Sequence, residues 1–425
     1  MKVLIVGSGG REHAIAWSVS KSPKVDKIYC APGNAGIAEL AECVDIGAME
    51  FEKLADFAQE KAIDLTIIGM DDPLVGGVVD VFEARGLKVF GPRKNAAILE
   101  GSKAFSKDLM KKYNIPTAAY ENFDDPEKAL EYLRTEARFP IVLKADGLAL
   151  GKGVLICQDL KEAEDGVKEI MEDKKFGNAG NTMVIEEFMT GREVSVLSFV
   201  DGKTIRTMTS AQDHKRAKDG DQGLNTGGMG TFSPSPFYND EVEAFCEKYV
   251  YQSTIDAMAS EGRPFTGILF TGLMITEDGP KVLEYNARFG DPEAQVVLPR
   301  MKNDIIDVME ACIDGKLSDV ELEFEELVNT LEKSLAEKIE SATIARYALW
   351  IEEIGKKYFL KIRGGSYGYM LNMTQEILLM ITAICIKEDK ITLKDLFKEY
   401  ERRGLFLDSY SQVEVIDLLG KLNLI

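Results

Sequence analysis

Residues 1–92 alternate short apolar runs with longer stretches in which apolar residues recur every three to four positions. The short runs predict β-strands and the longer stretches predict amphipathic helices. Strands that alternate with helices indicate a parallel α/β sheet, which binds ligands at the carboxyl ends of its strands. We expect strands at Val3–Val6, Lys27–Cys30, Leu65–Ile68 and Lys88–Phe90, and helices at Arg11–Ser20, Phe51–Lys61 and Pro73–Arg85.

A helix over Lys94–Tyr113 is expected to connect this sheet to a second unit. There the glycine-rich turn ADGLALGKG lies between two apolar runs, which predicts a hairpin lid rather than the strand-to-helix turn of a P-loop. The expected strands are Pro140–Lys144, Val154–Cys157, Met183–Phe188, Glu193–Phe199, Thr266–Ile275 and Lys281–Tyr285, with a long helix near Asp240–Ser260. The predicted fold class is therefore mixed α/β.

The last hundred or so residues differ in kind from the rest. Residues 327–425 contain 14 basic and 14 acidic residues, so residues 1–326 carry the whole net charge of −20, and all 13 prolines lie at or before Pro299. We predict a mostly helical, winged-helix-like segment at 327–425. The predicted domains are 1–102, 103–326 with a lid at about 115–190, and 327–425.

Composition narrows the functional class. An excess of 71 acidic over 51 basic residues argues against a nucleic-acid surface on residues 1–326, and leaves the question open for the neutral tail. Two histidines and six scattered cysteines argue against a zinc site and indicate reduced thiols. The apolar run Ile377–Ile386 is too short to cross a membrane, and MKVLIVGSGG is typical of a first strand rather than a signal peptide. We expect a soluble, cytoplasmic monomer.

The first glycine loop, Gly7–His13, follows a strand and opens a helix, so its N–H groups can bind a phosphate. A dinucleotide fingerprint would need a glycine where Glu12 stands and an acidic residue after the second strand, so NAD binding is disfavoured. A tight turn without a ligand remains an alternative.

The lid carries Lys144 and Lys152, point charges that suit phosphate oxygens at the end of a flexible glycine turn. Alone, this pattern favours a flexible surface hairpin over a phosphate site. The run Glu186-Glu187-Phe188, followed by Glu193, favours a nucleotide site, because a strand that ends in acidic and aromatic residues can bind adenine and ribose.

The segment LEYNARFGDPE places Glu284 and Asn286 on one face of a strand, two residues apart. Such hard oxygen ligands suit Mg²⁺ bridging nucleotide phosphates, and Arg288, which continues the alternation, can hold a carboxylate. A plain surface strand is the alternative. In the polar stretch 211–230, Asp213 can pair with an amine and the glycines allow close approach of a ligand, although a solvated loop with a structural His214 is also possible.

Eight motifs in this order carry a specific resemblance over residues 1–325: GSGGREHA, GNAG, IGMDDPLV, GPRKNAAILEGSKAFSK, VLKADGLALGKGV, VIEEFMTGREVSV, QDHKRAKDGDQGLNTGGMG and LEYNARFGDPEAQ. The chain resembles the phosphoribosylamine–glycine ligase family of ATP-grasp enzymes, which act in purine biosynthesis. The resemblance implies ATP and Mg²⁺ or Mn²⁺ as cofactors, with glycine and 5-phosphoribosylamine as substrates.

The resemblance also implies a role for each matching residue. The residues that it places at the nucleotide are Lys103, Lys144, Gly151, Lys152, Gly153, Glu186, Phe188 and Glu193, with Glu284 and Asn286 as metal ligands. Arg288 and Asp213 would hold glycine and, with Lys144, act in catalysis. Gly9, Gly10, Asn225, Thr226, Gly227 and Gly228 would face the phosphoribosylamine.

The tail departs from the family, which normally ends in a further α/β domain, and it is similar to part of a DNA-phosphorothioation-dependent restriction protein. We expect few contacts between the tail and the core, and a mobile junction near Glu325–Asn329. Two alternatives to the implied reaction stay open. One is an ATP-grasp ligase with a different acceptor, and the other is a catalytically impaired ATP-binding paralogue or fusion whose tail serves a partner or DNA.

Overall fold

The structure is a computed structural model. It describes residues 1–148, 153–214, 216–218, 222–225, 230–325, 360–362, 369–371, 375–386, 391–402, 407 and 409–421. By its internal contacts the chain divides into two compact units, residues 1–330 and residues 331–425. No helix in the described part of the chain combines the length and the apolar character that a membrane crossing needs.

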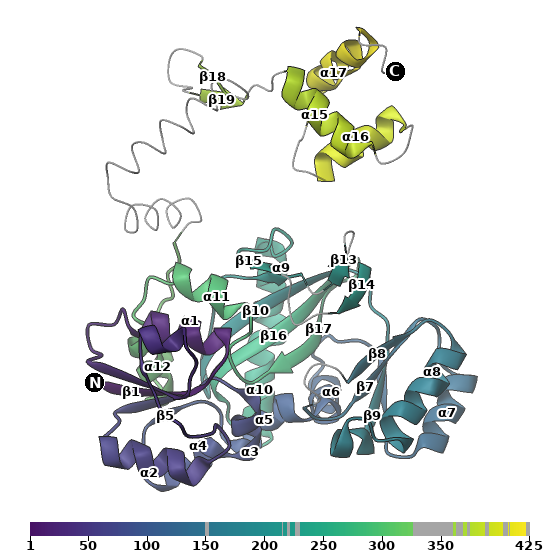
Figure 1. The fold of residues 1–425 in the computed structure, drawn as a ribbon. Coiled ribbons are helices and arrows are strands. Elements are labelled where there is room, and N and C mark those ends of the chain that lie inside the picture. Colours follow the sequence, from purple (N-terminus) through teal and green to yellow (C-terminus); the bar gives the residue numbers. More distant parts are fainter. Residues whose placement is uncertain are drawn as a thin grey trace. The chain divides into compact units, whose positions relative to one another are not determined.

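The N-terminal sheet is parallel throughout, with the strand order β3-β2-β1-β4-β5 (Figure 1). Alternate residues of β1 pack on opposite faces, Leu4 and Val6 in one core and Val3 and Ile5 in the other, so both faces are covered and the strands are almost wholly apolar. The strands are β1 Lys2–Gly7, β2 Lys27–Pro32, β3 Glu42–Cys43, β4 Leu65–Ile68 and β5 Val89–Phe90, and the helices are α1 Gly10–Val19, η1 Ile37–Glu39, α2 Phe51–Lys61, α3 Asp71–Gly76 and α4 Val78–Ala84.

Two helices that the periodicity predicted as continuous are each broken. The helix expected at Pro73–Arg85 divides at Gly77, whose φ of +101° is left-handed and ends α3. The helix expected at Lys94–Tyr113 divides into α5 Lys94–Gly101 and α6 Lys103–Lys112. Ser102 has an extended backbone there and its Oγ accepts the N–H of Phe105 at 3.0 Å, so it caps a new helix instead of continuing the old one.

The central sheet is antiparallel, in the order β11-β10-β16-β17, and its long strands run through the middle of residues 1–330 (Figure 1). Its apolar side chains belong to the same two cores as the N-terminal sheet, so the two sheets share their interior. Its strands are β10 Arg192–Asp201, β11 Ile205–Thr207, β16 Thr266–Thr276 and β17 Gly279–Asn286.

The helices between residues 240 and 319 are α9 Asp240–Cys246, a π-helix Glu247–Tyr251, α10 Gln252–Ser260, α11 Ala294–Val297, η5 Leu298–Arg300, α12 Ile305–Ile313 and η6 Leu317–Asp319.

A third sheet, in the order β6-β9-β7-β8, lies in the region predicted to be a lid and is called the lid sheet here, and its strands β7 and β8 make the predicted hairpin (Figure 1). Helices α7 and α8 cover it with a core of its own, which includes Ala129, Leu133, Leu143 and Val167. The lid elements are β6 Tyr120–Phe123, α7 Pro126–Thr135, β7 Ile141–Ala145, β8 Val154–Cys157, α8 Leu160–Val167, a π-helix Lys168–Glu172, η3 Gly177–Asn181 and β9 Met183–Glu187.

Short strands β12 Gln212–Asp213 and β15 Thr231–Phe232 pair with each other, as do β13 Arg216–Lys218 and β14 Gln222–Asn225. In the second unit the described residues form the hairpin β18 Leu360–Ile362 with β19 Tyr369–Leu371 and the helices α15 Gln375–Cys385, α16 Leu393–Arg402 and α17 Ser409–Lys421. These helices share a small core around Leu378, Leu396 and Tyr400. The winged-helix-like arrangement stays a prediction, and the expected junction falls mainly outside the described residues.

The contact between the N-terminal and central sheets gives a stability prediction. Gly267 in β16 has a φ of +135°, and a Cβ there would lie 2.9 Å from Pro92 Cδ and 3.2 Å from Gly91 Cα. Gly267→Ala should therefore lower the free energy of unfolding in urea by about 3 kcal/mol, through backbone strain and overpacking together. Gly262→Ala is the matched control, because Gly262 has a φ of +71° and nothing within 4 Å of the added atom, and it should cost about 1 kcal/mol. Equal losses would contradict the role of the close contact.

Candidate active site

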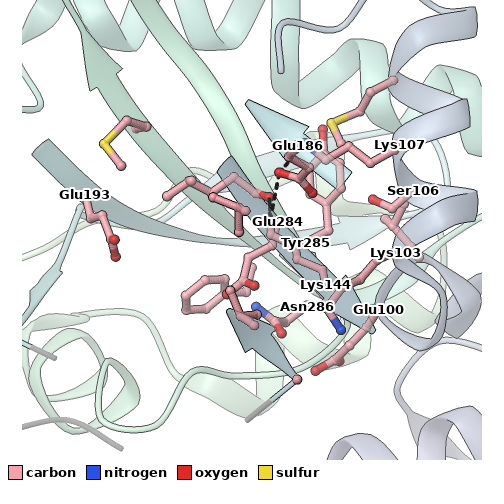
Figure 2. Close-up of a pocket in the computed structure, with 18 of the residues that line it drawn as sticks. Glu100, Lys103, Ser106, Lys107, Lys144, Glu186, Glu193, Glu284, Tyr285 and Asn286 are labelled. Carbon is pink, nitrogen blue, oxygen red and sulfur yellow. Dashed lines mark hydrogen bonds and ion pairs between the residues drawn. The ribbon is translucent and has the colours of Figure 1, made fainter. Parts of the chain in front are cut away.

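A cavity of about 400 Å³ lies among the lid sheet, the central sheet and helices α5 and α6. Its volume is within the range of small-molecule sites. Figure 2 shows side chains of these helices along one side of the cavity and Glu193 of β10 at the other. The predicted site residues that line it are Lys103, Lys144, Gly153, Glu186, Phe188, Glu193, Asp213, Glu284, Asn286 and Arg288.

The N-terminus of α6 is joined to the turn that follows β7. The Asp146 carboxylate accepts the Ser102 hydroxyl at 3.1 Å and the Ala104 N–H at 3.1 Å, where the positive end of the helix favours an anion. The Lys103 ammonium donates to the Gly147 carbonyl at 2.8 Å. Burial lowers the pKa of Lys103, and nearby Glu284 opposes this shift. The lysine therefore holds its charge at the cavity wall at an energetic cost that a bound anion would relieve.

Two lysines share one buried carboxylate deeper in the cavity. The Nζ atoms of Lys107 and Lys144 each lie 3.0 Å from Glu186 Oε2, and the three side chains are between 3% and 9% exposed. Lys107 also donates to Thr117 Oγ1 at 2.8 Å. Burial lowers the pKa of Lys107 to about 8, and the neighbouring Lys144 charge adds to this shift while Glu186 opposes it.

Glu284 and Asn286 lie on one face of β17, as the alternation predicted, and both line the cavity. The described residues contain no group of three or more His, Cys, Asp or Glu side chains arranged for a metal. A single carboxylate with one amide oxygen nevertheless fits Mg²⁺, which usually keeps several waters and binds phosphates beside one or two protein oxygens. The donor set is therefore compatible with the metal that the sequence predicted.

Strand β17 ends at Asn286, so Arg288 lies just beyond the strand rather than on it, but its side chain reaches the same cavity. Its Nη2 lies 3.0 Å from Glu100 Oε1 and donates to Asn286 Oδ1 at 3.2 Å. Glu100 also accepts the Ala287 N–H at 2.7 Å. Burial raises the pKa of Glu100, and the Arg288 charge opposes that rise.

Three buried polar atoms that have no hydrogen-bond partner among the described residues belong to side chains of this cavity. They are Ser106 Oγ, Glu186 Oε1 and Arg288 Nε. An unsatisfied buried polar group costs about 1–3 kcal/mol, so these three atoms are candidates for hydrogen bonds to water or to a polar ligand.

Asp213, which lines the cavity, lies in β12 and accepts the Thr231 hydroxyl at 3.4 Å. The other predicted residues are not among those that line the cavity, or lie outside the described residues. Gly9 and Gly10 do not line the cavity, but a Cβ on Gly9 would lie 3.4 Å from the carboxylate of Asp291, which does. Asn225 is the last residue of β14. Gly151 and Lys152, with Thr226, Gly227 and Gly228, lie outside the described residues.

Sequence reasoning missed Glu100, Ser106 and Lys107, which all line the cavity. Spacing could have found Lys107, because it lies four residues after Lys103 and so on the same face of α6. It could not have found Glu100, which lies in α5 before the break at Ser102. From the sequence alone, a helix face with charged residues is expected to be exposed to solvent. No local pattern indicates that these side chains are buried in the cavity.

The Glu100–Arg288 pair gives a second stability prediction. Glu100→Leu should lower the free energy of unfolding by about 3–5 kcal/mol, because it leaves the Arg288 guanidinium buried without its counter-charge. Glu83→Leu is the control, since it breaks the exposed pair with Arg93 and should cost at most about 1 kcal/mol. Urea unfolding of both variants measures the difference, and similar losses would mean that the buried pair contributes no more than a surface pair.

Family models match most of residues 1–325. The N domain of phosphoribosylglycinamide synthetase matches residues 1–100, and its ATP-grasp (A) domain matches residues 101–294. Two relatives are both called phosphoribosylamine–glycine ligase. That of Caldanaerobacter subterraneus subsp. tengcongensis is 49% identical over 326 residues, which are 77% of this chain and 78% of the relative. That of Haemophilus influenzae is 52% identical over 323 residues, 75% of each chain.

Solved structures agree with the sequence comparisons. The crystal structure of phosphoribosylamine–glycine ligase from Thermotoga maritima has a TM-score of 0.64 and 34% identity, and the match covers 74% of this chain and 76% of the other. The biotin carboxylase domain of Hydrogenobacter thermophilus 2-oxoglutarate carboxylase, crystallised with MgADP, has a TM-score of 0.58 over 76% and 72% of the two chains, but at 17% identity it shares only the fold. The sequence motifs, the family models and the identity to these relatives agree, and the chain belongs to the phosphoribosylamine–glycine ligase family of ATP-grasp proteins.

Proposed function

We propose that this protein joins glycine to 5-phosphoribosylamine at the expense of ATP, giving glycinamide ribonucleotide, ADP and phosphate in purine biosynthesis. The observation that carries the proposal is the single cavity in which Lys103 and Lys144 face Glu284, Asn286 and Arg288. Family membership with about half of the residues identical supports the same reaction.

The reaction has two steps, and both depend on positioning rather than on a protein nucleophile. An oxygen of the glycine carboxylate attacks the γ-phosphorus of ATP and ADP leaves, which gives glycyl phosphate. The amine nitrogen of phosphoribosylamine then attacks the acyl carbon, phosphate leaves, and the nitrogen loses a proton. A closed lid would keep water from the acyl phosphate.

The nucleotide would occupy the space between the lid and the central sheet. Lys103 and Lys144 supply positive charge for the triphosphate. We assign Gly151, Lys152 and Gly153 of the glycine-rich turn to the same phosphates. Three further residues line the same cavity: Glu186 in β9, Phe188 just after β9, and Glu193 in β10. This supports their assignment to the adenosine.

Glu284 and Asn286 would hold the metal, and Mg²⁺ or Mn²⁺ bound there neutralises phosphate charge. Arg288 suits the glycine carboxylate, since its guanidinium is a planar donor and the residue lines the cavity. Asp213, which also lines the cavity, suits the glycine amine. We assign Gly9 and Gly10, at the carboxyl end of β1, to the phosphoribosylamine together with Asn225, Thr226, Gly227 and Gly228, because a loop before a helix favours a phosphate.

The proposal includes a monomeric enzyme of the cytoplasm. Elution from a size-exclusion column with light-scattering detection tests the monomer directly.

The reaction is tested by measuring ADP release. Release should require glycine and phosphoribosylamine together, and the product should contain both. ATP binding without this dependence would instead favour the catalytically impaired paralogue, and release with another amine would favour a ligase with a different acceptor.

Removal of either proposed metal ligand should abolish most of the turnover. Glu284→Ala and Asn286→Ala should each lower kcat by roughly 100-fold or more, because each removes one oxygen from a cation that neutralises the transferring phosphoryl group. Circular dichroism should show an intact fold. Glu277→Ala, in the exposed turn between β16 and β17, is the control and should retain normal activity. Wild-type rates in Glu284→Ala or Asn286→Ala at saturating Mg²⁺ would remove these residues from the metal site.

Arg288→Lys should raise the KM for glycine by about tenfold or more, because an ammonium cannot replace the planar fork of a guanidinium on a carboxylate. The KM for ATP should change little, and Arg93→Lys at an exposed position should change neither constant. Steady-state kinetics with each substrate varied in turn measures the effect, and an unchanged glycine KM would exclude Arg288 from the glycine site.

A further inference from the structure

Lys107 is a buried charge for which neither the sequence motifs nor the proposed reaction has a role. Its side chain is 3% exposed, and its two described polar partners are protein groups, Glu186 Oε2 at 3.0 Å and Thr117 Oγ1 at 2.8 Å. The Thr117 hydroxyl in turn donates to the Val282 carbonyl of β17 at 2.7 Å. The ammonium group therefore links α6, the lid strand β9 and the central sheet at one point.

The carboxylate of Glu186 has more positive charge around it than neutrality needs. Lys107 and Lys144 approach the same oxygen, Oε2, each at 3.0 Å, while Oε1 is buried without a hydrogen-bond partner among the described residues. When Lys107, Lys144 and Glu186 are all ionised, these three groups carry a net charge of +1. The Glu187 carboxylate also faces Lys107, but it is paired with Lys281 at 3.6 Å. Figure 2 shows Lys107 and Glu186 close together, with Lys144 extending from β7 along the cavity wall.

Stability alone is a weak explanation for this arrangement. A buried carboxylate needs one cation, and even a well-paired buried ion pair often contributes little to folding compared with apolar side chains. A second lysine adds another desolvated charge, and burial acts against that charge. The excess positive charge has a clear use, however, if an anion enters the cavity.

The two lysines differ in what they can reach. Lys107 is held on both sides by Glu186 and Thr117. Apart from Glu186, the described polar partner of Lys144 is the Leu283 carbonyl at 3.4 Å, which is a long contact. If Lys107 were neutral, the carboxylate would pair with Lys144 alone, and Lys144 would be drawn away from an anion and neutralised.

We propose that Lys107 is a positioning residue, which binds the Glu186 carboxylate so that the Lys144 ammonium keeps its charge for the phosphates of the nucleotide. This inference rests on the proposed function, since it takes the anion to be ATP. Lys107 touches neither ATP nor the reacting atoms, and it acts through Glu186.

The test compares Lys107→Met with Lys107→Arg and with Lys111→Met, an exposed lysine one turn further along α6. Calorimetric titration with adenylyl imidodiphosphate and Mg²⁺ gives the Kd without turnover. Lys107→Met should weaken binding by about tenfold or more and raise the KM for ATP in parallel, with the KM for glycine unchanged. Lys107→Arg should bind within about threefold of the wild type, and Lys111→Met should bind normally. An unchanged Kd in Lys107→Met would overturn the inference.

A double-mutant cycle separates positioning from direct contact. In a Glu186→Gln background the carboxylate charge is absent, so a further change of Lys107 to Met should alter the Kd by less than about twofold. A loss as large as in the wild-type background would mean that Lys107 meets the nucleotide directly, and would overturn its role as a positioning residue.

The pH dependence of nucleotide binding gives a further test, which compares the wild type with Lys107→Arg and does not use the Lys107→Met variant. The charged groups that face Lys107 are Glu186, Glu187 and Lys144, and the Tyr120 ring lies 5.9 Å away. Because the pKa of Lys107 lies near 8, the wild type should lose affinity for the nucleotide as the pH rises from about 7 to 9. Lys107→Arg stays charged and should lose less, while other groups such as Lys103 affect both proteins alike. Identical profiles would overturn the inference.

These outcomes remain distinct from those for the proposed function. A chain that binds the nucleotide but does not form glycinamide ribonucleotide would contradict the proposed function, while the Kd comparison would still decide the role of Lys107. Normal ligation with an unaffected Kd in Lys107→Met would contradict the role of Lys107 alone. A chain that binds no nucleotide would overturn both.

Discussion

A charged side chain that leaves water must find an opposite charge or a polar partner, and helices α5 and α6 bring three such side chains into the interior. Glu100 meets Arg288 beyond β17, Lys103 meets the Gly147 carbonyl after β7, and Lys107 meets Glu186 in β9. Each pair joins the helices to a different part of the chain. The walls of the cavity are therefore fixed relative to one another by the need to pair buried charge.

The same requirement connects the N-terminal sheet to this cavity. Arg11, in the first turn of α1, donates to the Phe289 carbonyl at 3.1 Å and to Glu12, whose other carboxylate oxygen accepts the Gly9 N–H at 2.6 Å. The glycine loop is thus held against the segment that follows Arg288. In the proposed reaction, this arrangement would keep a phosphoribosylamine at the loop close to an activated glycine in the cavity.

Local sequence was sufficient for elements whose pattern is set by their immediate surroundings. The continuous apolar runs of β1 and β4 predicted buried parallel strands, and alternation placed Glu284 and Asn286 on one face of β17. The breaks at Gly77 and Ser102 were missed, because both residues are tolerated within a helical pattern and only the backbone conformation shows that a helix ends there. The extent of the domains and the roles of the site residues remain predictions.

The sequence by itself determined the class of this protein, since the ordered motifs from GSGGREHA to LEYNARFGDPEAQ identify the family. It also determined which strands are buried, because hydrophobic burial follows a local period. Only the tertiary structure decided how the charges are paired. Glu186 binds Lys107 and Lys144, and Glu100 binds Arg288, across 79, 42 and 188 positions of sequence. No local pattern encodes such pairs, because the partner of a buried charge depends on which distant element packs against it.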